Sequence, residues 1–65
     1  MDRQKIGERL RLLRGNMTAE ELGQRLGVTQ QAISYYEKGQ RIPRDEIKQE
    51  YARLFNVSVE EIFYT

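Results

Sequence analysis

The chain has 65 residues and a formal net charge of +1, with nine Lys/Arg against five Asp/Glu in residues 1–44 and two against five in residues 45–65. It contains no cysteine and no histidine, which excludes disulfides and thiolate metal sites and removes the commonest general base. No apolar run reaches the roughly 18 residues of a membrane span and no signal peptide is apparent, so we expect one cytoplasmic domain over residues 1–65, with no enzymatic activity, metal, cofactor or small-molecule ligand.

A first helix is predicted over residues 2–14. Its apolar stripe at i, i+4 and i+7 consists of Ile6, Leu10 and Leu13. Leu12 falls off this stripe, and we place it at the edge. Gly15 and Asn16 then break the helix and turn the chain. Met17 follows and is expected to pack near the start of the next helix, as a hydrophobic staple does.

A second, shorter helix is predicted over residues 19–26. Thr18 and Glu21 form a capping box at its start, in which the hydroxyl and the carboxylate each satisfy a backbone donor. Its inward face consists of Leu22 and Leu26. Gly23 lies in mid-helix, where glycine costs roughly 1 kcal/mol relative to alanine. This cost predicts that a second helix approaches closely at that position.

A tight turn and a third helix over residues 30–37 come next. Gly27 ends the preceding helix in the left-handed conformation, and Thr29 caps the new one. The inward side chains are predicted to be Val28, Ile33 and Tyr36. The outward side chains are predicted to be Gln30, Gln31, Ser34 and Tyr35. Gly39 is expected to close the third helix as a left-handed cap.

A fourth helix is predicted over residues 44–55, after Pro43 has prevented the third from continuing. Asp45 and Glu46 suit the positive end of its dipole. Its core stripe consists of Ile47, Tyr51, Leu54 and Phe55. A second capping box, Ser58 with Glu61, opens a short fifth helix. Its apolar residues are Val59, Ile62 and Phe63. Five short helices leave no room for a sheet, so the expected fold class is all-α.

The segment from residue 19 to residue 37 resembles the helix-turn-helix of the phage repressor and Cro family. The matching positions are Gly23, Gly27, Leu22, Leu26, Val28, Ile33 and Tyr36. The later segments GQRIPRDE and NVSVEEIF extend the resemblance over essentially the whole chain. The turn at residues 15–17 is about two residues shorter than is usual in the family. The resemblance implies a lambda-repressor-like DNA-binding fold with the motif as helices two and three; an ordinary helical hairpin in a small bundle is the alternative.

The resemblance places the outward residues of the third helix in the major groove of DNA. The base-contacting candidates are Gln30, Gln31, Ser34 and Tyr35. A glutamine amide can meet N6 and N7 of adenine together, and the N-terminal end of such a helix enters deepest. The alternatives are that the glutamines are plain surface and that Tyr35 packs on the fourth helix.

Phosphate contacts are expected at both ends of the motif, where they fix register without reading sequence. The candidates are Thr18, Ala19, Thr29, Lys38, Gln40, Arg41 and Arg44. Many relatives have a glutamine where this chain has Ala19, so only backbone amides and the helix dipole remain there. For Arg44 the alternative is an ion pair with a carboxylate such as Glu46.

An acid beside a phosphate-binding surface needs a partner, and the resemblance implies that Glu37 is structural. In similar proteins an acid at this place bridges to an arginine on the first helix. Arg14 is the preferred partner, with Arg9 and Arg11 as alternatives because the following turn is short.

Binding by one small domain should be weak, so we expect a homodimer on a palindromic double-stranded DNA operator. The candidate dimer surface is Ile62, Phe63 and Tyr64. The alternative for Ile62 and Phe63 is that they complete the core over Leu10 and Leu54.

The sequence therefore predicts a sequence-specific transcriptional regulator, of Cro or repressor type, from a phage, prophage or other mobile element. The basic residues 1–44 favour a surface that faces phosphates, although charges on solvated helices would give the same count. The alternative function is a protein-interaction module, such as an antitoxin or adaptor. Glu20 and Glu21 are adjacent on a helix and diverge, so they do not form an acid/base pair for catalysis.

Overall fold

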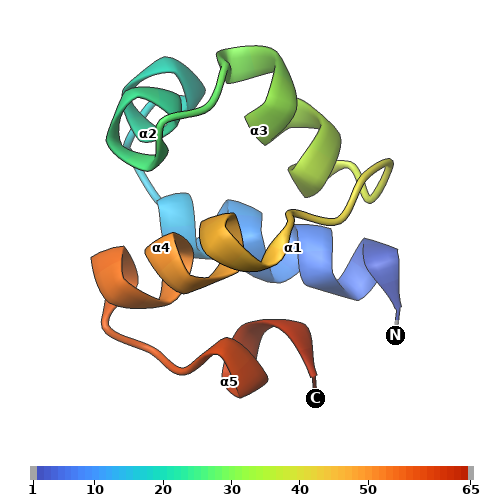
Figure 1. Cartoon of the computed structure of the whole chain (residues 1–65). Helices are drawn as coiled ribbons and strands as arrows, with labels where there is room; N and C mark the ends of the chain where they lie inside the picture. Colours follow the sequence, from blue (N-terminus) through green and yellow to red (C-terminus); the bar gives the residue numbers. More distant parts are fainter. Residues whose placement is uncertain (1, 65) are drawn as a thin grey trace.

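The computed structural model describes residues 2–64 and folds them into five α-helices, with no strand among these residues (Figure 1). The helices are α1 (Arg3–Arg14), α2 (Ala19–Leu26), α3 (Gln30–Glu37), α4 (Asp45–Phe55) and α5 (Val59–Phe63). The predicted all-α fold and helix order are confirmed. Asp2 and Arg44, where the first and fourth helices were predicted to start, are instead the N-caps of α1 and α4, so both helices begin one residue later than predicted. Residues 1 and 65, the ends of the predicted domain, lie outside the described range.

Local hydrogen bonds define the helix ends. Both predicted capping boxes form: Glu21 N donates to Thr18 Oγ1 at 3.0 Å, and Thr18 N donates to Glu21 Oε1 at 2.9 Å. Ser58 and Glu61 exchange the same pair of bonds, both at 3.0 Å. Gly27 adopts the predicted left-handed conformation with φ of 74°, which ends α2. These contacts depend on residues three or fewer apart, which is why the sequence predicted the helix limits well.

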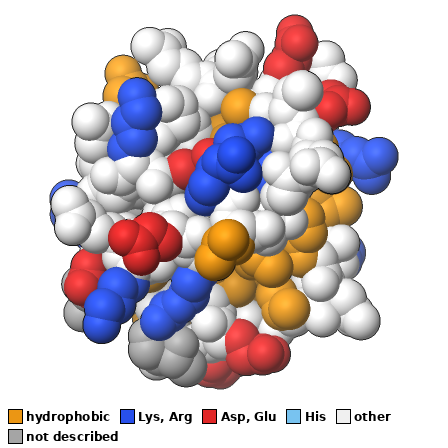
Figure 2. All heavy atoms as spheres, turned by 180° about the vertical axis from the view of Figure 1, so that it is seen from behind, with side chains coloured by type: hydrophobic (Ala, Val, Ile, Leu, Met, Phe, Trp, Pro, Cys, Tyr) orange, Lys and Arg blue, Asp and Glu red, His pale blue; other side chains and the backbone are white. Residues whose placement is uncertain are grey.

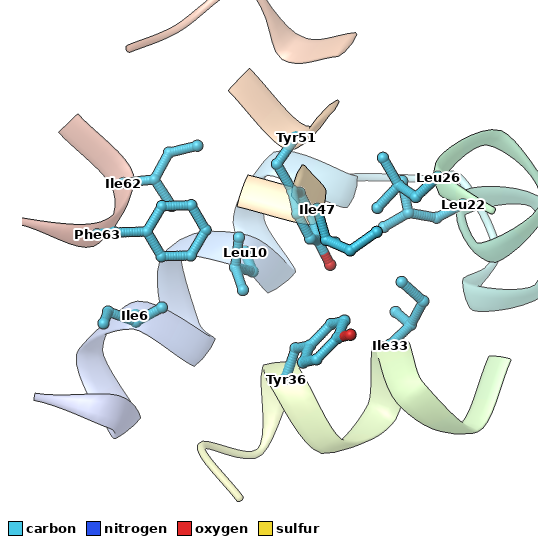
Figure 3. Packing of buried hydrophobic residues seen from close by; sticks show 10 residues of the cluster. All are labelled: Ile6, Leu10, Leu22, Leu26, Ile33, Tyr36, Ile47, Tyr51, Ile62 and Phe63. Atoms are coloured by element: carbon cyan, nitrogen blue, oxygen red, sulfur yellow. The ribbon is translucent and has the colours of Figure 1, made fainter. Parts of the chain in front are cut away.

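The core lies where α1 crosses the other helices. In Figure 1, α1 runs behind α4, with the α2–α3 pair above and α5 below. The buried apolar residues are Ile6, Leu10, Leu22, Leu26, Ile33, Tyr36, Ile47, Tyr51, Ile62 and Phe63 (Figure 3). Tyr51 meets both Tyr36 and Phe63 edge to face, each with ring centroids 6.4 Å apart. α4 therefore joins the α2–α3 pair to α5 through one aromatic cluster.

The prediction that Ile62 and Phe63 of α5 form part of a dimer surface is wrong, because both side chains are buried. Ile62 and Phe63 are only 2% and 1% exposed and complete the core, which is the other alternative left open by the sequence. They cannot present a surface to a partner. Tyr64 alone of the three is exposed. Leu12, expected at the edge of the core, is instead 80% exposed.

Within residues 2–64, no helix combines the length and hydrophobicity that crossing a membrane would require. The same part of the chain holds no group of three or more acidic side chains arranged to bind a metal ion.

Candidate nucleic-acid interface

The α2 and α3 segments can approach closely because Gly23 of α2 has no side chain. A Cβ atom there would lie 2.7 Å from the carbonyl oxygen of Val28 and 3.2 Å from the carbonyl carbon of Thr29. The predicted close approach is confirmed, and it is made by the turn and the residue that caps α3. The glycine thus sets how near the start of α3 comes to α2.

α3 has one face in the core and one face toward solvent. Ile33 and Tyr36 are buried, whereas Gln30 and Gln31 are exposed. Ser34 is half-buried on the side between these faces. The cap at the start of the helix forms as predicted, with Ala32 N donating to Thr29 Oγ1 at 3.0 Å. The two glutamine side chains are therefore presented together from the first turn of a helix whose orientation is fixed by its buried face.

Tyr35 is held against the loop that follows α3. The guanidinium carbon of Arg41 lies 4.9 Å from the centroid of the Tyr35 ring, at cation–π distance. Gln31 Nε2 donates to the Tyr35 hydroxyl at 3.5 Å, a long and weak bond. Tyr35 is half-buried, and the guanidinium of the loop residue Arg41 lies against its ring. A glutamine, a phenol and a guanidinium thus form one unit at the surface.

The chain leaves α3 through a Schellman motif. Gly39 N donates to Tyr36 O at 3.2 Å and Gln40 N donates to Tyr35 O at 2.9 Å, with Gly39 at φ of 74° as predicted. Lys38, Gln40 and Arg41 are all exposed around this turn. Two cations, Lys38 and Arg41, therefore flank the C-terminal end of α3.

α1 supports the end of α3 through Gly7, a position that the sequence analysis missed. A Cβ atom on Gly7 would collide with the carbonyl oxygen of Glu37 and lie 2.9 Å from that of Tyr36. Gly39 makes a similar approach, since its Cβ position is 3.1 Å from the carbonyl oxygen of Arg3. The available signal was a glycine in the middle of an otherwise helical pattern.

Glu37 and Arg14 are brought together at the same crossing. Arg14 donates to both carboxylate oxygens, from Nε at 2.8 Å and from a terminal nitrogen at 3.0 Å, and also to the carbonyl of Met17 at 2.7 Å. The two side chains are 15% and 10% exposed. The hydrogen bond with Glu37 raises the pKa of the Arg14 guanidinium above its usual value. The negative charge of Glu37, which lies next to Lys38 in sequence, is therefore compensated by Arg14 of α1.

The start of α2 offers fewer donors than expected. The Thr18 amide is occupied by Glu21, whose pKa the hydrogen bond from Thr18 lowers below its usual value. The remaining unsatisfied donors of the first turn are the amides of Ala19 and Glu20. Two carboxylates in that turn oppose a phosphate, so the contact at this end would be weaker than at the loop.

Arg44 is an exposed N-cap of α4, and no carboxylate within residues 2–64 forms an ion pair with it. A hollow of about 400 Å³ lies between Arg44, Arg41 and the first turns of α3, with Thr29 on its wall. Arg44, Arg41 and Thr29 thus share one side of the α3 surface.

Comparisons with known proteins identify the family to which this fold belongs. A helix-turn-helix family model matches residues 8–62. An uncharacterized HTH-type transcriptional regulator of Archaeoglobus fulgidus is 44% identical over 48 residues, which cover 74% of this chain and 68% of that protein. A similar regulator of Methanocaldococcus jannaschii is 40% identical over 48 residues, covering 74% of this chain and 73% of its own.

Two solved structures have the same fold. The restriction-modification controller protein C.AhdI from Aeromonas hydrophila matches with a TM-score of 0.83 at 28% identity, covering 95% of this chain and 93% of that one. The clp gene regulator ClgR from Corynebacterium glutamicum gives a TM-score of 0.82, covering 95% and 68% of the two chains, and at 23% identity it supports the fold alone. The chain belongs to the Cro/C1-type helix-turn-helix family of transcriptional regulators, whose fold binds DNA.

Proposed function

We propose that this protein is a sequence-specific repressor that reads the major groove of double-stranded DNA with α3. The observation that carries the proposal is the pair of exposed glutamines, Gln30 and Gln31, on the first turn of a helix fixed from behind by buried residues. Each amide can pair with N6 and N7 of an adenine, a contact worth about 1–3 kcal/mol of discrimination. Ser34 and Tyr35 lie one turn further along and extend the same reading surface.

The phosphate contacts come mainly from the end of α3 and the loop after it. Lys38, Gln40, Arg41 and Arg44 are exposed there, and Thr29 caps α3 beside them. The ion pair between Arg14 and Glu37 supports this arrangement, because an unpaired carboxylate at the end of α3 would repel the phosphate backbone of DNA. At the start of α2, the Ala19 amide and the exposed Thr18 contribute a smaller share.

Two copies bind a palindromic operator, with the α3 helices spaced by one helical turn of about 34–36 Å. One α3 of eight residues reads few base pairs, so a second copy supplies the missing specificity. A cytoplasmic regulator encoded by a phage, prophage or other mobile element fits this design. The similarity to a restriction-modification controller gives a second candidate, the control of a restriction-modification system.

The experiment that tests the proposal is selection of bound duplexes from a random library, followed by salt titration on the selected sequence. The proposal requires one enriched, two-fold symmetric sequence and a log–log salt dependence with a slope near −0.9 per phosphate contact. Binding without enrichment, or no binding at low salt, would leave the alternative of a protein-interaction module, such as an antitoxin or adaptor.

A further inference from the structure

Charged side chains of both signs are mixed on the surface of the molecule. Figure 2 shows Lys/Arg and Asp/Glu side chains interspersed over the face opposite the view of Figure 1, and the formal net charge is only +1. Phosphate contacts, which use charge, fix the position of a protein on DNA without reading its sequence. The choice of a base pair must therefore come from the hydrogen-bonding groups that α3 presents.

The Gln31 amide is one of these groups, and Tyr35 already occupies part of it. The two residues are four positions apart on α3 and so lie on the same side of the helix. Gln31 Nε2 donates to the Tyr35 hydroxyl at 3.5 Å. The Tyr35 ring is itself held by the Arg41 guanidinium, whose carbon lies 4.9 Å from the ring centroid. Tyr35 is half-buried and Gln31 is exposed, so the hydroxyl is the better fixed of the two groups.

We propose that Tyr35 makes Gln31 select adenine over guanine, because the hydroxyl occupies one of the two N–H donors of the amide. The inference rests on the proposed function, in which Gln31 meets a base edge in the major groove, and it names the base. A glutamine amide has two N–H donors and one carbonyl acceptor. With one donor bonded to Tyr35, Gln31 retains one donor and one acceptor. Adenine requires this combination, since its N7 accepts and its N6 amino group donates.

Guanine needs a different combination at the same edge. Its N7 and O6 are both acceptors, so it is satisfied by an amide that turns both N–H donors toward it. Gln31 has a single N–H donor left, and one guanine acceptor would stay without a partner in a contact that excludes water. A polar group buried without a partner costs more than a typical hydrogen bond gains. Tyr35 is therefore a positioning residue, which decides what base Gln31 accepts by controlling the amide.

Gln30 provides a comparison within the same helix turn. It is exposed like Gln31, but its side chain forms no hydrogen bond within residues 2–64. Both N–H donors of its amide are available to DNA, so its preference between adenine and guanine should not depend on Tyr35. A change at Tyr35 should therefore affect the base pair that Gln31 reads and leave the base pair that Gln30 reads as it was.

Selection of bound duplexes followed by competition binding tests this difference. The base pair that each glutamine reads is assigned as the one whose preference is lost in Gln30→Ala or Gln31→Ala. At the Gln31 base pair, Tyr35→Phe should lower the ratio of affinities for A·T over G·C by at least about threefold, the size expected for one hydrogen bond. At the Gln30 base pair, this ratio should stay within about twofold of the wild-type value.

A hypoxanthine–cytosine pair at the Gln31 position separates the major groove from the minor groove. Hypoxanthine has the major-groove acceptors of guanine but lacks its minor-groove amino group, so this pair should behave as G·C does in both proteins. Lys38→Ala is the matched control on the protein side. It removes a positive charge near the end of α3, and it should weaken binding to every duplex while preserving both ratios.

The outcomes separate this inference from the proposed function. An unchanged ratio at the Gln31 base pair of Tyr35→Phe would overturn the role of Tyr35. A raised ratio would overturn it as well, since it would mean that the hydroxyl donates to the amide oxygen. An equal fall at the Gln30 base pair would show a general disturbance of α3, and a Gln31→Ala variant with unaltered preference would show that Gln31 reads no base. The proposed function itself fails only if the wild-type protein enriches no sequence.

Discussion

Arg14 and Glu37, 23 residues apart, form a two-pronged ion pair with N–O distances of 2.8 and 3.0 Å at the crossing of α1 and α3. Arg14 also donates to Met17, so one guanidinium fixes the end of α1, the following turn and the end of α3. The pair is mostly shielded from solvent, where a bidentate arginine–carboxylate contact is stronger than on an exposed surface.

Glu37→Ala should therefore destabilise the fold by about 2–3 kcal/mol, since it leaves a largely buried guanidinium without its partner. Base preference should change little, because the carboxylate faces α1. Urea unfolding and operator selection, run side by side, measure both effects. The matched control is Glu50→Ala, which removes an exposed pair with Arg53 and should cost less than about 0.5 kcal/mol. An unchanged unfolding midpoint for Glu37→Ala would refute the structural role.

Gly7→Ala should destabilise the protein by about 3 kcal/mol, although alanine in an ordinary helix interior is the better residue by about 1 kcal/mol. The added methyl group collides with the carbonyl of Glu37, which is backbone and cannot rotate away. The sign is the test: chemical denaturation that shows a gain in stability would mean that α1 and α3 are further apart than described. Gly7→Ser should be at least as damaging, because it has the same Cβ.

Tyr51→Phe should raise stability by about 1 kcal/mol. The Tyr51 hydroxyl is buried without a hydrogen-bond partner among the described residues, and burial raises the pKa of its phenol far above the usual value. Removing the oxygen removes a desolvation penalty that no hydrogen bond offsets, while the ring contacts with Tyr36 and Phe63 remain. Thermal unfolding measures the change. A loss of stability would show that the hydroxyl has a partner, such as an internal water.

The helix limits could be predicted because their causes are local. The capping boxes Thr18/Glu21 and Ser58/Glu61 each lie within four residues and predict where α2 and α5 begin. Gly27 and Gly39 predict where α2 and α3 end. The ion pair could be anticipated only through the family resemblance, since nothing in the spacing of Arg14 and Glu37 brings them together.

The remaining features depend on how helices distant in sequence cross. Gly7 is required because α1 touches the backbone of α3, and no periodicity of α1 alone reveals that. Ile62 and Phe63 are apolar, as residues of either a core or an interface would be. They belong to the core because α5 packs beneath α1 and α4. Leu12 is one residue from the stripe, and it is 80% exposed.

Acid should remove part of the stability through the capping glutamates. Hydrogen bonds from Thr18 and Ser58 lower the pKa values of Glu21 and Glu61 below their usual 4.5. Their contribution is therefore complete above about pH 4.5 and is lost as pH falls through the lowered folded values. Thermal melts between pH 7 and pH 3 should show the wild type above the double variant Glu21→Gln/Glu61→Gln at pH 7, with the two curves converging in acid. Parallel curves would contradict the capping role.

Because Gln31, Tyr35 and Arg41 contact one another, we expect base recognition and phosphate binding to be coupled in this protein. Gln30→Ala and Gln31→Ala should each change which base pair is preferred, with a cost of about 1–3 kcal/mol on the selected operator. Lys38→Ala should weaken binding to every duplex alike and reduce the salt slope by about 1. Arg41→Ala should do the same and also alter preference beside Tyr35, because its guanidinium stacks on that ring.

A double-mutant cycle on the operator separates these two effects of Arg41. Arg41→Ala and Tyr35→Leu should be coupled by about 0.5–1 kcal/mol, the range of an exposed cation–π contact. Lys38→Ala and Tyr35→Leu should be additive, which makes Lys38 the matched control of equal charge on the same turn. Equal coupling in both cycles would show that Arg41 acts only as a charge. Coupling confined to Arg41 would show that this arginine both binds phosphate and holds Tyr35 in position for the base beside it.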